Sequence, residues 1–193
     1  MPQVRKAARE KLPEIAGSTD PDYVVEALSI ALSNWNSWGR IEEGDKEVIL
    51  QIICEEKIAK SLRSKLISSA SGPMPSLFSQ LGRTPILDEK MEEIASFAIQ
   101  PSVRAKAYRS LFEGRIVWME GRKWEWTDIR YCEGRLKPVV AERKLNVKAP
   151  MLELLKKSSE DRSSIVRRVS AEIPIRELDR LGSVARTFTE RFI

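Results

Sequence analysis

Residues 150–173 read PMLELLKKSSEDRSSIVRRVSAEI, and this stretch indicates the fold class. Apolar residues recur at helical spacing on both sides of a polar interruption, which is typical of amphipathic helices. We expect one helix over Pro150–Ser158 and a second over Arg162–Glu172, with Asp161 in the turn between them. The stretch therefore predicts two short helices that pair across a tight turn.

The rest of the chain is dominated by helical patterns of the same kind. The longest is predicted at Lys46–Ser68, where Ile52, Ala59, Leu62 and Leu66 share one helical face. We recognise no strand-turn-strand pattern, and the chain contains no GxGxxG or GxxxxGK[ST] string, which excludes Rossmann and P-loop architectures. The sequence therefore predicts an all-α protein of about eight helices. The other expected helices cover residues 3–12, Tyr23–Ser33, Asp88–Ile99, Pro101–Ile116, Pro138–Leu145 and Arg176–Phe192.

Two segments interrupt the helical pattern. Residues 71–85 read SGPMPSLFSQLGRTP and contain five glycines and prolines, which favours a break in regular structure. We predict a flexible joint at 71–87 within a single domain that covers residues 1–193. Residues 117–135 contain three of the five tryptophans. The alternation of Trp124 and Trp126 fits a short extended piece, but we favour a loop with a helix start at Thr127–Asp128.

Three segments of the chain resemble one another. Each begins with Val-Arg, at Val4, Val103 and Val166, and continues with small residues and then Leu or Ile. Small residues at this spacing let two antiparallel helices approach closely. This pattern resembles the second helix of HEAT repeats in the armadillo/HEAT α-solenoid group, well over residues 93–116 and 149–173 and weakly over residues 4–33.

The resemblance implies irregular HEAT-like antiparallel helix pairs in a right-handed α-α superhelix. In that family an aspartate in the turn between helices and an arginine six residues later form a hydrogen-bonded ladder between repeats. By this resemblance Asp161 and Arg167 are expected to form a structural ladder. Arg104 falls among the apolar residues of its helix, so we expect it also to bond a neighbouring turn or carbonyl.

The composition excludes several chemistries. The chain has 193 residues and no histidine, which rules out catalysis or metal binding through histidine. Its two cysteines, Cys54 and Cys132, are too few for a disulfide framework or a four-cysteine zinc site. We therefore expect no metal and no cofactor, and we expect Cys54, within an apolar run, to be buried and inert. No apolar run approaches the ~20 residues of a membrane span, and we predict a cytoplasmic protein without a membrane partner.

Charge is distributed unequally along the chain. The net charge is +5, with −3 in residues 1–96 and +8 in residues 97–193. A basic half can attract nucleic acid or an acidic protein, although a solvated surface explains the same composition. The candidate residues for partner or nucleic-acid binding lie off the predicted apolar stripes and are Lys106, Arg109, Lys156, Lys157 and Arg168.

The tryptophan-rich segment supports two further interpretations. Aromatic and cationic residues alternate there, as in proteins that bind single-stranded nucleic acid, but the tryptophans can equally pin a long connection to the body. Trp124 and Asp128 also resemble the Trp and Asp, four residues apart, of the HEAT-like alkylpurine DNA glycosylases, which add an Arg from a later repeat. The resemblance implies that Arg168 or Arg167 would supply this cation, and that Asp128 would stabilise an oxocarbenium-like sugar.

The sequence as a whole predicts a non-catalytic helical-repeat protein that binds or scaffolds a macromolecular partner. A protein partner is favoured over nucleic acid because acidic residues are interspersed throughout the basic half. The alternative is a nucleic-acid-binding HEAT-like protein related to the alkylpurine DNA glycosylases. Enzyme activity is left open, and Trp124, Asp128 and Arg168 are the one catalytic set that the sequence suggests.

Overall fold

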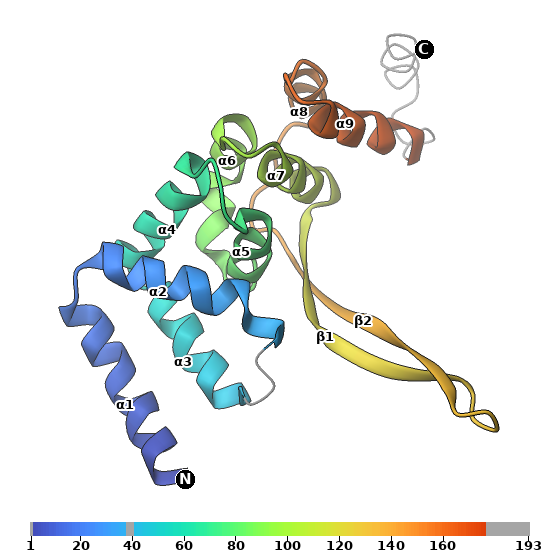
Figure 1. The fold of residues 1–193 in the computed structure, drawn as a ribbon. Coiled ribbons are helices and arrows are strands. Elements are labelled where there is room, and N and C mark those ends of the chain that lie inside the picture. The colour runs from blue at the N-terminus through green and yellow to red at the C-terminus, as the bar shows by residue number, and fades with distance from the viewer. Residues whose placement is uncertain (1, 38–40, 177–193) are drawn as a thin grey trace.

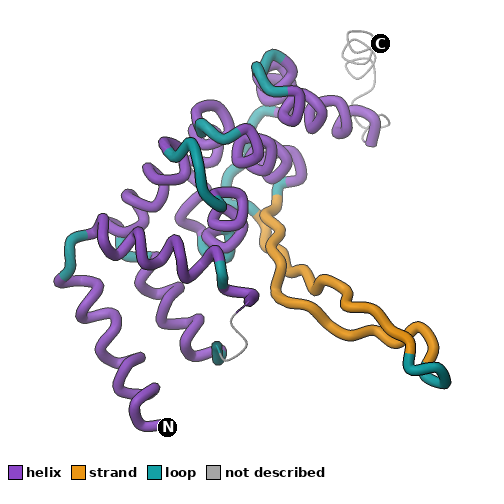
Figure 2. The backbone as a smooth tube through the Cα atoms, in the orientation of Figure 1, coloured by secondary structure: helices purple, strands orange, loops and turns teal. Residues whose placement is uncertain are grey.

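The computed structural model describes residues 2–37 and 41–176, which form a helical body with one long projecting β-hairpin (Figures 1 and 2). The described residues contain nine α-helices and a two-stranded antiparallel sheet. The prediction of a mostly helical chain is confirmed, whereas the prediction that it is all-α was wrong because of the hairpin. None of the described helices is both long enough and apolar enough to cross a membrane.

In the first part of the body, α1 packs on α3 and α2 packs on α4. Asp20 caps the start of α2, because its carboxylate accepts a hydrogen bond from the Asp22 amide and Pro21 occupies the first turn. Arg9 ties α1 to α3 through its Nε, 2.8 Å from the Asp45 carboxylate. The elements of this part are α1 (Pro2–Ser18), α2 (Pro21–Ser33), the short 3-10 helix η1 (Trp35–Ser37), α3 (Glu43–Ile53) and α4 (Glu56–Ser68).

The predicted long helix Lys46–Ser68 was wrong in one respect, because the chain bends between α3 and α4. Glu55 has an extended backbone (φ −65°, ψ 127°), which ends the first helix before the second begins. Ile53 and Ile58 are both buried, yet five residues apart they would point in different directions on one straight helix. The bend lets both side chains reach the core.

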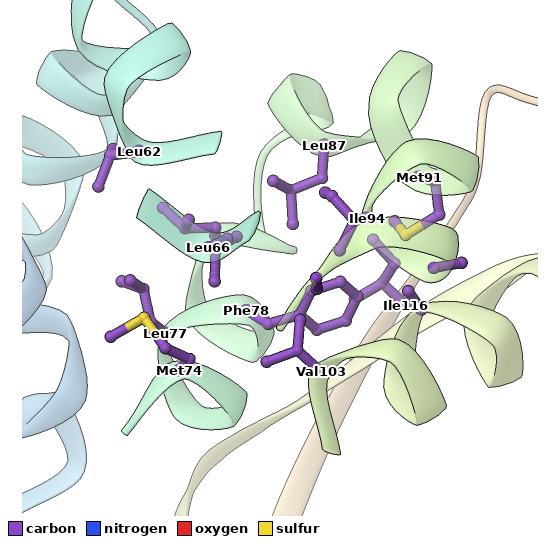
Figure 3. Close-up of a cluster of buried hydrophobic side chains, with 14 of the residues drawn as sticks. Leu62, Leu66, Met74, Leu77, Phe78, Leu87, Met91, Ile94, Val103 and Ile116 are labelled. Atoms are coloured by element: carbon purple, nitrogen blue, oxygen red, sulfur yellow. The ribbon is translucent and has the colours of Figure 1, made fainter. Parts of the chain in front are cut away.

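The core lies where α4, α5, α6 and α7 meet the start of the hairpin (Figure 3). Leu66, Phe78, Met91, Val103 and Ile116 come from five different elements and are all buried in this cluster. The glycine- and proline-rich stretch at 71–87 contains α5, and the flexible joint proposed there stays a prediction. The elements of this part are α5 (Met74–Leu81), the 3-10 helix η2 (Pro85–Lys90), α6 (Met91–Phe97) and α7 (Pro101–Glu113).

The last described helices, α8 (Met151–Ser159) and α9 (Ser164–Arg176), pack against each other and against α7. Their bounds lie within about two residues of the predicted pair at the N-terminal ends and extend further at the end of α9. The helix predicted at Arg176–Phe192 lies, beyond its first residue, outside the described residues.

The hairpin replaces structures that the sequence predicted differently. Strands β1 (Arg115–Asp128) and β2 (Glu133–Lys144) pair in antiparallel register from Arg115 opposite Lys144 to Asp128 opposite Glu133. The loop expected at 117–135 and the helix expected at Pro138–Leu145 were therefore both wrong. The register is interrupted between Met119 and Gly121 and again between Trp126 and Asp128.

Candidate functional site

The β-hairpin of residues 115–144 starts where α7 is forced to end. Gly114 closes α7 in the left-handed region (φ 65°), which glycine adopts without steric cost. Arg115 is followed by Ile116, Val117 and Trp118, and β-branched and aromatic side chains favour an extended backbone. The chain thus leaves the helical body as a strand.

The far end of the hairpin turns without a glycine. Asp128 accepts a hydrogen bond from the Arg130 amide (2.8 Å), and the Cys132 amide donates to the Ile129 carbonyl (3.3 Å). Cys132 has a positive φ of 55°, which is uncommon for a residue with a side chain. The turn side chains of Ile129 and Tyr131 are about three-quarters exposed.

The two faces of the hairpin differ in chemistry because side chains alternate along each strand. Residues opposite each other share a face, so Trp124 lies with Leu136, and Lys123 lies with Lys137 on the other face. We refer to residues 115–120 and 140–144 as the root, and to residues 121–139 as the arm. In Figure 1 the root adjoins the helical body and the arm extends away from it.

Ile116 fixes the root to the core. Its side chain is fully buried against Gly82, at the end of α5. A Cβ added at Gly82 would lie 2.3 Å from Ile116 Cγ2 and 3.1 Å from the Ser79 carbonyl oxygen. Gly82 is therefore required for close approach of strand and helix, and not for an unusual backbone angle.

Arg143 fixes the second strand of the root. Its guanidinium donates to both carboxylate oxygens of Asp88 (2.6 and 2.9 Å) and to the carbonyls of Gly82 and Thr84 (2.6 and 2.5 Å). Asp88 is buried and also accepts a hydrogen bond from the Asn146 amide (3.0 Å). A bidentate pair of this kind is strong and directional, so it sets the direction in which the hairpin leaves the body.

A third contact holds the outer end of the root. The Arg83 guanidinium lies 5.4 Å from the ring centroids of both Trp35 and Trp118 and forms an ion pair with Glu120 (2.9 Å). Trp118 Nε1 donates to the same carboxylate (2.7 Å). Burial alone would raise the pKa of Glu120, but the hydrogen bonds from Arg83 and Trp118 outweigh it and hold the pKa below its usual value.

The arm carries large apolar side chains in solvent. Trp124, Trp126 and Leu136 share one face, and their exposed fractions are 44%, 53% and 56%. The two indole rings meet edge to face with centroids 5.5 Å apart, and Trp124 covers Gly134, where an added Cβ would lie 2.5 Å from the ring. We refer to these three residues as the apolar face of the arm.

The opposite face of the arm is basic. Lys123, Arg135 and Lys137 lie there around Glu125, and the hydrogen bond from Lys137 lowers the pKa of Glu125. We refer to these three cations as the basic face of the arm. Residues 121–139 contain five Lys and Arg against three Asp and Glu, a net charge of +2. Three of these cations form no ion pair with any residue in the described part of the chain: Arg122, Lys123 and Arg130.

The structure does not bring the suggested glycosylase residues together. Trp124 and Asp128 both lie on β1, but the register shift after Trp126 puts them on opposite faces of the hairpin. Arg168 is exposed on α9, which packs against α7 rather than against the arm. The expected combination of a nucleotide-stacking Trp, a nearby carboxylate and a cation is therefore not formed.

The five predicted binding cations do not form one surface. Lys106 Nζ donates to the Pro75 carbonyl (3.0 Å) and to Ser79 Oγ (2.5 Å) on α5, and desolvation lowers the pKa of Lys106 although much of the residue is exposed. Arg109 pairs with Glu172 of α9 (2.7 Å). The remaining three residues are exposed on α8 and α9 and are Lys156, Lys157 and Arg168.

The residues of the expected ladder form a larger buried network. Arg167 Nη1 donates to the Asp161 carbonyl (2.9 Å), but the Asp161 carboxylate pairs with Arg104 of α7 (2.8 and 2.9 Å). Arg104 is 2% exposed and also donates to the Ala98 carbonyl (2.7 Å), six residues before it. Arg104 and Arg167 thus occupy corresponding positions, each bonded to the turn that precedes its own helix.

Both cysteines are free and exposed in the structure. Cys54 is exposed at the bend between α3 and α4, so the expectation of a buried thiol was wrong, and partial burial still raises its pKa. Cys132 is exposed at the turn of the hairpin. Among the described residues, no group of three or more Cys, Asp or Glu side chains is arranged to hold a metal ion.

Sequence reasoning missed the hairpin although a signal was present. Apolar and charged residues alternate from Trp124 to Trp126, and Val139 and Val140 are β-branched, as strands require. The turn that joins the strands contains no Asn-Gly or Asp-Gly pair, and Pro138 lies within the second strand, so the usual hairpin signals were absent.

Comparison with known proteins adds no family to this description. The chain matches no protein-family model, and no curated protein or solved structure is significantly similar to it. The candidate site is accordingly defined by the geometry of the hairpin.

Proposed function

We propose that the chain is a non-catalytic binding protein that docks a protein partner through the arm. The observation that carries this proposal is the apolar face of the arm, where two tryptophans and a leucine are about half exposed. Contiguous apolar surface costs solubility and marks interaction sites, and tryptophan is enriched among the residues that dominate binding energy. None of the three side chains belongs to the hydrophobic core that the described residues form.

The anchoring of the root supports the same function. An isolated two-stranded hairpin is at best marginally stable in water, so a projecting one needs support at its base. Ile116, Arg143 and Arg83 supply that support through a buried side chain, a bidentate ion pair and a stacked cation. A firmly held root lowers the entropy that the arm loses when a partner binds.

A protein partner is favoured over nucleic acid by the distribution of charge. Proteins that bind single strands place aromatic rings and cations on one surface, so that bases stack while phosphates pair. Here only Arg122 shares the face of Trp124, whereas the three cations of the basic face lie on the opposite side, and Glu125 already pairs with two of those three. A net charge of +2 over the arm is also small for a phosphate-binding ribbon.

The helical body would serve as the scaffold. We propose that α6–α7 and α8–α9 are degenerate HEAT-like pairs, supported by the corresponding bonds of Arg104 to Ala98 and of Arg167 to Asp161. The Arg104–Asp161 ion pair would then be the link between successive repeats. We further propose that the protein acts in the cytoplasm, because both cysteines are free and exposed, which suits a reducing compartment.

Site-specific photo-crosslinking tests the proposed function. Benzoylphenylalanine replaces Trp126 on the arm or, as a control, Tyr23, which is 75% exposed on α2. After illumination in an extract of the cells that produce the chain, the Trp126 probe is expected to capture a defined protein that the Tyr23 probe does not. Capture of nuclease-sensitive material at Trp126 would establish the nucleic-acid alternative, and equal capture by both probes would overturn the assignment to the arm.

A further inference from the structure

We propose that the partner adds a strand to the open edge of β1, and that this strand alternates acidic and apolar residues. The inference rests on the proposed function and specifies the chemistry of its partner. Within the described residues the sheet has only two strands, so each strand has one edge whose N–H and C=O groups lack a sheet partner. Such an edge is a template on which an extended peptide can form main-chain hydrogen bonds.

The edge of β1 is the better template. Proline in a sheet is confined to positions where its missing N–H would face solvent, so Pro138 removes a donor from the open edge of β2. Between Gly121 and Trp126, β1 contains no proline and keeps an uninterrupted register with β2. The register shifts on either side of this segment limit the available edge to six residues, about the length of an average strand.

The two faces of the arm determine the composition of the added strand. Alternate residues of an incoming strand would lie beside the apolar face and beside the basic face in turn. Next to Trp124 and Trp126 the partner gains most from apolar side chains. Next to Lys123 it gains most from carboxylates.

An unfavourable contact in the free arm points the same way. Lys123 and Lys137 are directly opposite each other on β1 and β2, and like charges at such positions destabilise a sheet. Glu125 pairs with Lys137 and Arg135, whereas Lys123 forms no ion pair with a described residue. A carboxylate on an added strand would pair with Lys123. This charge complementarity is the reason for assigning an acidic strand to the partner.

Fluorescence anisotropy with labelled peptides tests the inference on the full chain. The probe is a short peptide of alternating valine and glutamate, and the comparison peptides replace glutamate by lysine or one central valine by proline. We expect the valine–glutamate peptide to bind, the valine–lysine peptide not to bind, and the proline peptide to bind at least about tenfold more weakly, because proline removes an edge hydrogen bond. Equal binding of the parent and proline peptides would overturn strand addition.

Matched charge reversals locate the binding site. The double variant Lys123→Glu with Lys137→Glu is expected to weaken binding at least about tenfold, whereas Lys156→Glu with Lys157→Glu changes the net charge equally and should leave binding within about twofold. All four lysines are on the surface away from the core, and circular dichroism verifies the fold of each variant. Equal losses in the two double variants would overturn the assignment to the arm.

The outcome separates the inference from the proposed function. If no peptide binds but the Trp126 probe still captures a protein, the proposal of an added acidic strand is wrong, whereas the proposal that the arm docks a protein partner is retained. If neither experiment gives a specific result, both are wrong.

Discussion

Arg104 and Asp161 form the buried ion pair on which the contact between α7 and the α8–α9 pair depends. Their side chains are 2% and 9% exposed. Removal of one partner of such a pair leaves the other charge buried without compensation, so Arg104→Ala is expected to lower the free energy of unfolding by about 3–5 kcal/mol. Arg167→Ala removes one hydrogen bond to a carbonyl and should cost only about 1 kcal/mol. Urea denaturation of both variants measures the difference, and a larger loss for Arg167→Ala would contradict this ranking.

The same pair predicts a dependence of stability on pH. Burial tends to raise the pKa of Asp161, but hydrogen bonds from Arg104 and from the Ser163 amide outweigh burial and lower it. Because the folded pKa lies below that of an unfolded aspartate, about 3.9, the stabilisation is complete above that value and is lost as the pH falls through the folded pKa. Thermal melts of the wild type and of Asp161→Asn between neutral and acidic pH should therefore converge as acid is added. A constant gap between the two would exclude Asp161 as the titrating group.

Gly82 offers a sharp test of the root at a single residue. Gly82→Ala places a methyl group 2.3 Å from Ile116 Cγ2, so strand and helix must separate, at a cost of about 1–3 kcal/mol. Gly17→Ala is the control, because no atom lies within 4 Å of the new methyl group and alanine favours the helix over glycine by about 1 kcal/mol. Chemical denaturation is expected to show destabilisation for the first and a small stabilisation for the second. Equal effects would mean that Ile116 is not packed on Gly82.

At the scale of elements, sequence patterns predicted the helices better than the hairpin. Helical periodicity located α2, α7 and α8, in which apolar residues recur at helical spacing and a proline lies near the start. The bend at Glu55 was missed because the predicted stripe that includes Ile52 and Leu62 fits one continuous helix. The structure shows that Ile53 and Ile58 are buried as well, which one straight helix does not allow.

The strands were missed for a different physical reason. In most strands, apolar and polar residues alternate because one face of the strand is buried. Neither face of the arm is buried, so this cause of alternation is absent there. The candidate site was therefore not predictable as a site, although Trp124 was singled out as part of an unusual segment. The basic residues that were predicted on α7 contact α5 and α9, because these helices pack beside α7 and place the Pro75 carbonyl and the Glu172 carboxylate within reach of Lys106 and Arg109.

The arm and the root should behave as separate parts. Replacement of residues 122–138 by Asn-Gly, which joins Gly121 to Val139 through a tight turn, removes the arm and keeps every contact of the root described above. The free energy of unfolding is expected to change by no more than about 0.5 kcal/mol, as for other surface changes. Ile116→Ala, which empties a buried site in the root, should instead cost about 2–5 kcal/mol. A shortened chain that melts like Ile116→Ala would show that the arm is part of the folding unit.

At the scale of the whole molecule, the helical body holds a hairpin by its root and leaves the apolar and basic faces of the arm in solvent (Figures 1 and 2). The arm carries a net charge of +2, and two exposed lysines, Lys156 and Lys157, lie on α8. These two surfaces are the competing locations for a partner. They belong to different elements, so a method that resolves segments of the chain can distinguish them.

Hydrogen–deuterium exchange with and without the valine–glutamate peptide makes this distinction most directly. The account predicts that bound peptide slows exchange of the amides in residues 121–126, because main-chain hydrogen bonds on the open edge of β1 protect them. Exchange in α8 (Met151–Ser159) should not change. Protection confined to α8, or an unchanged arm under conditions in which the peptide is bound, would contradict the claim that the arm is the docking element of this protein.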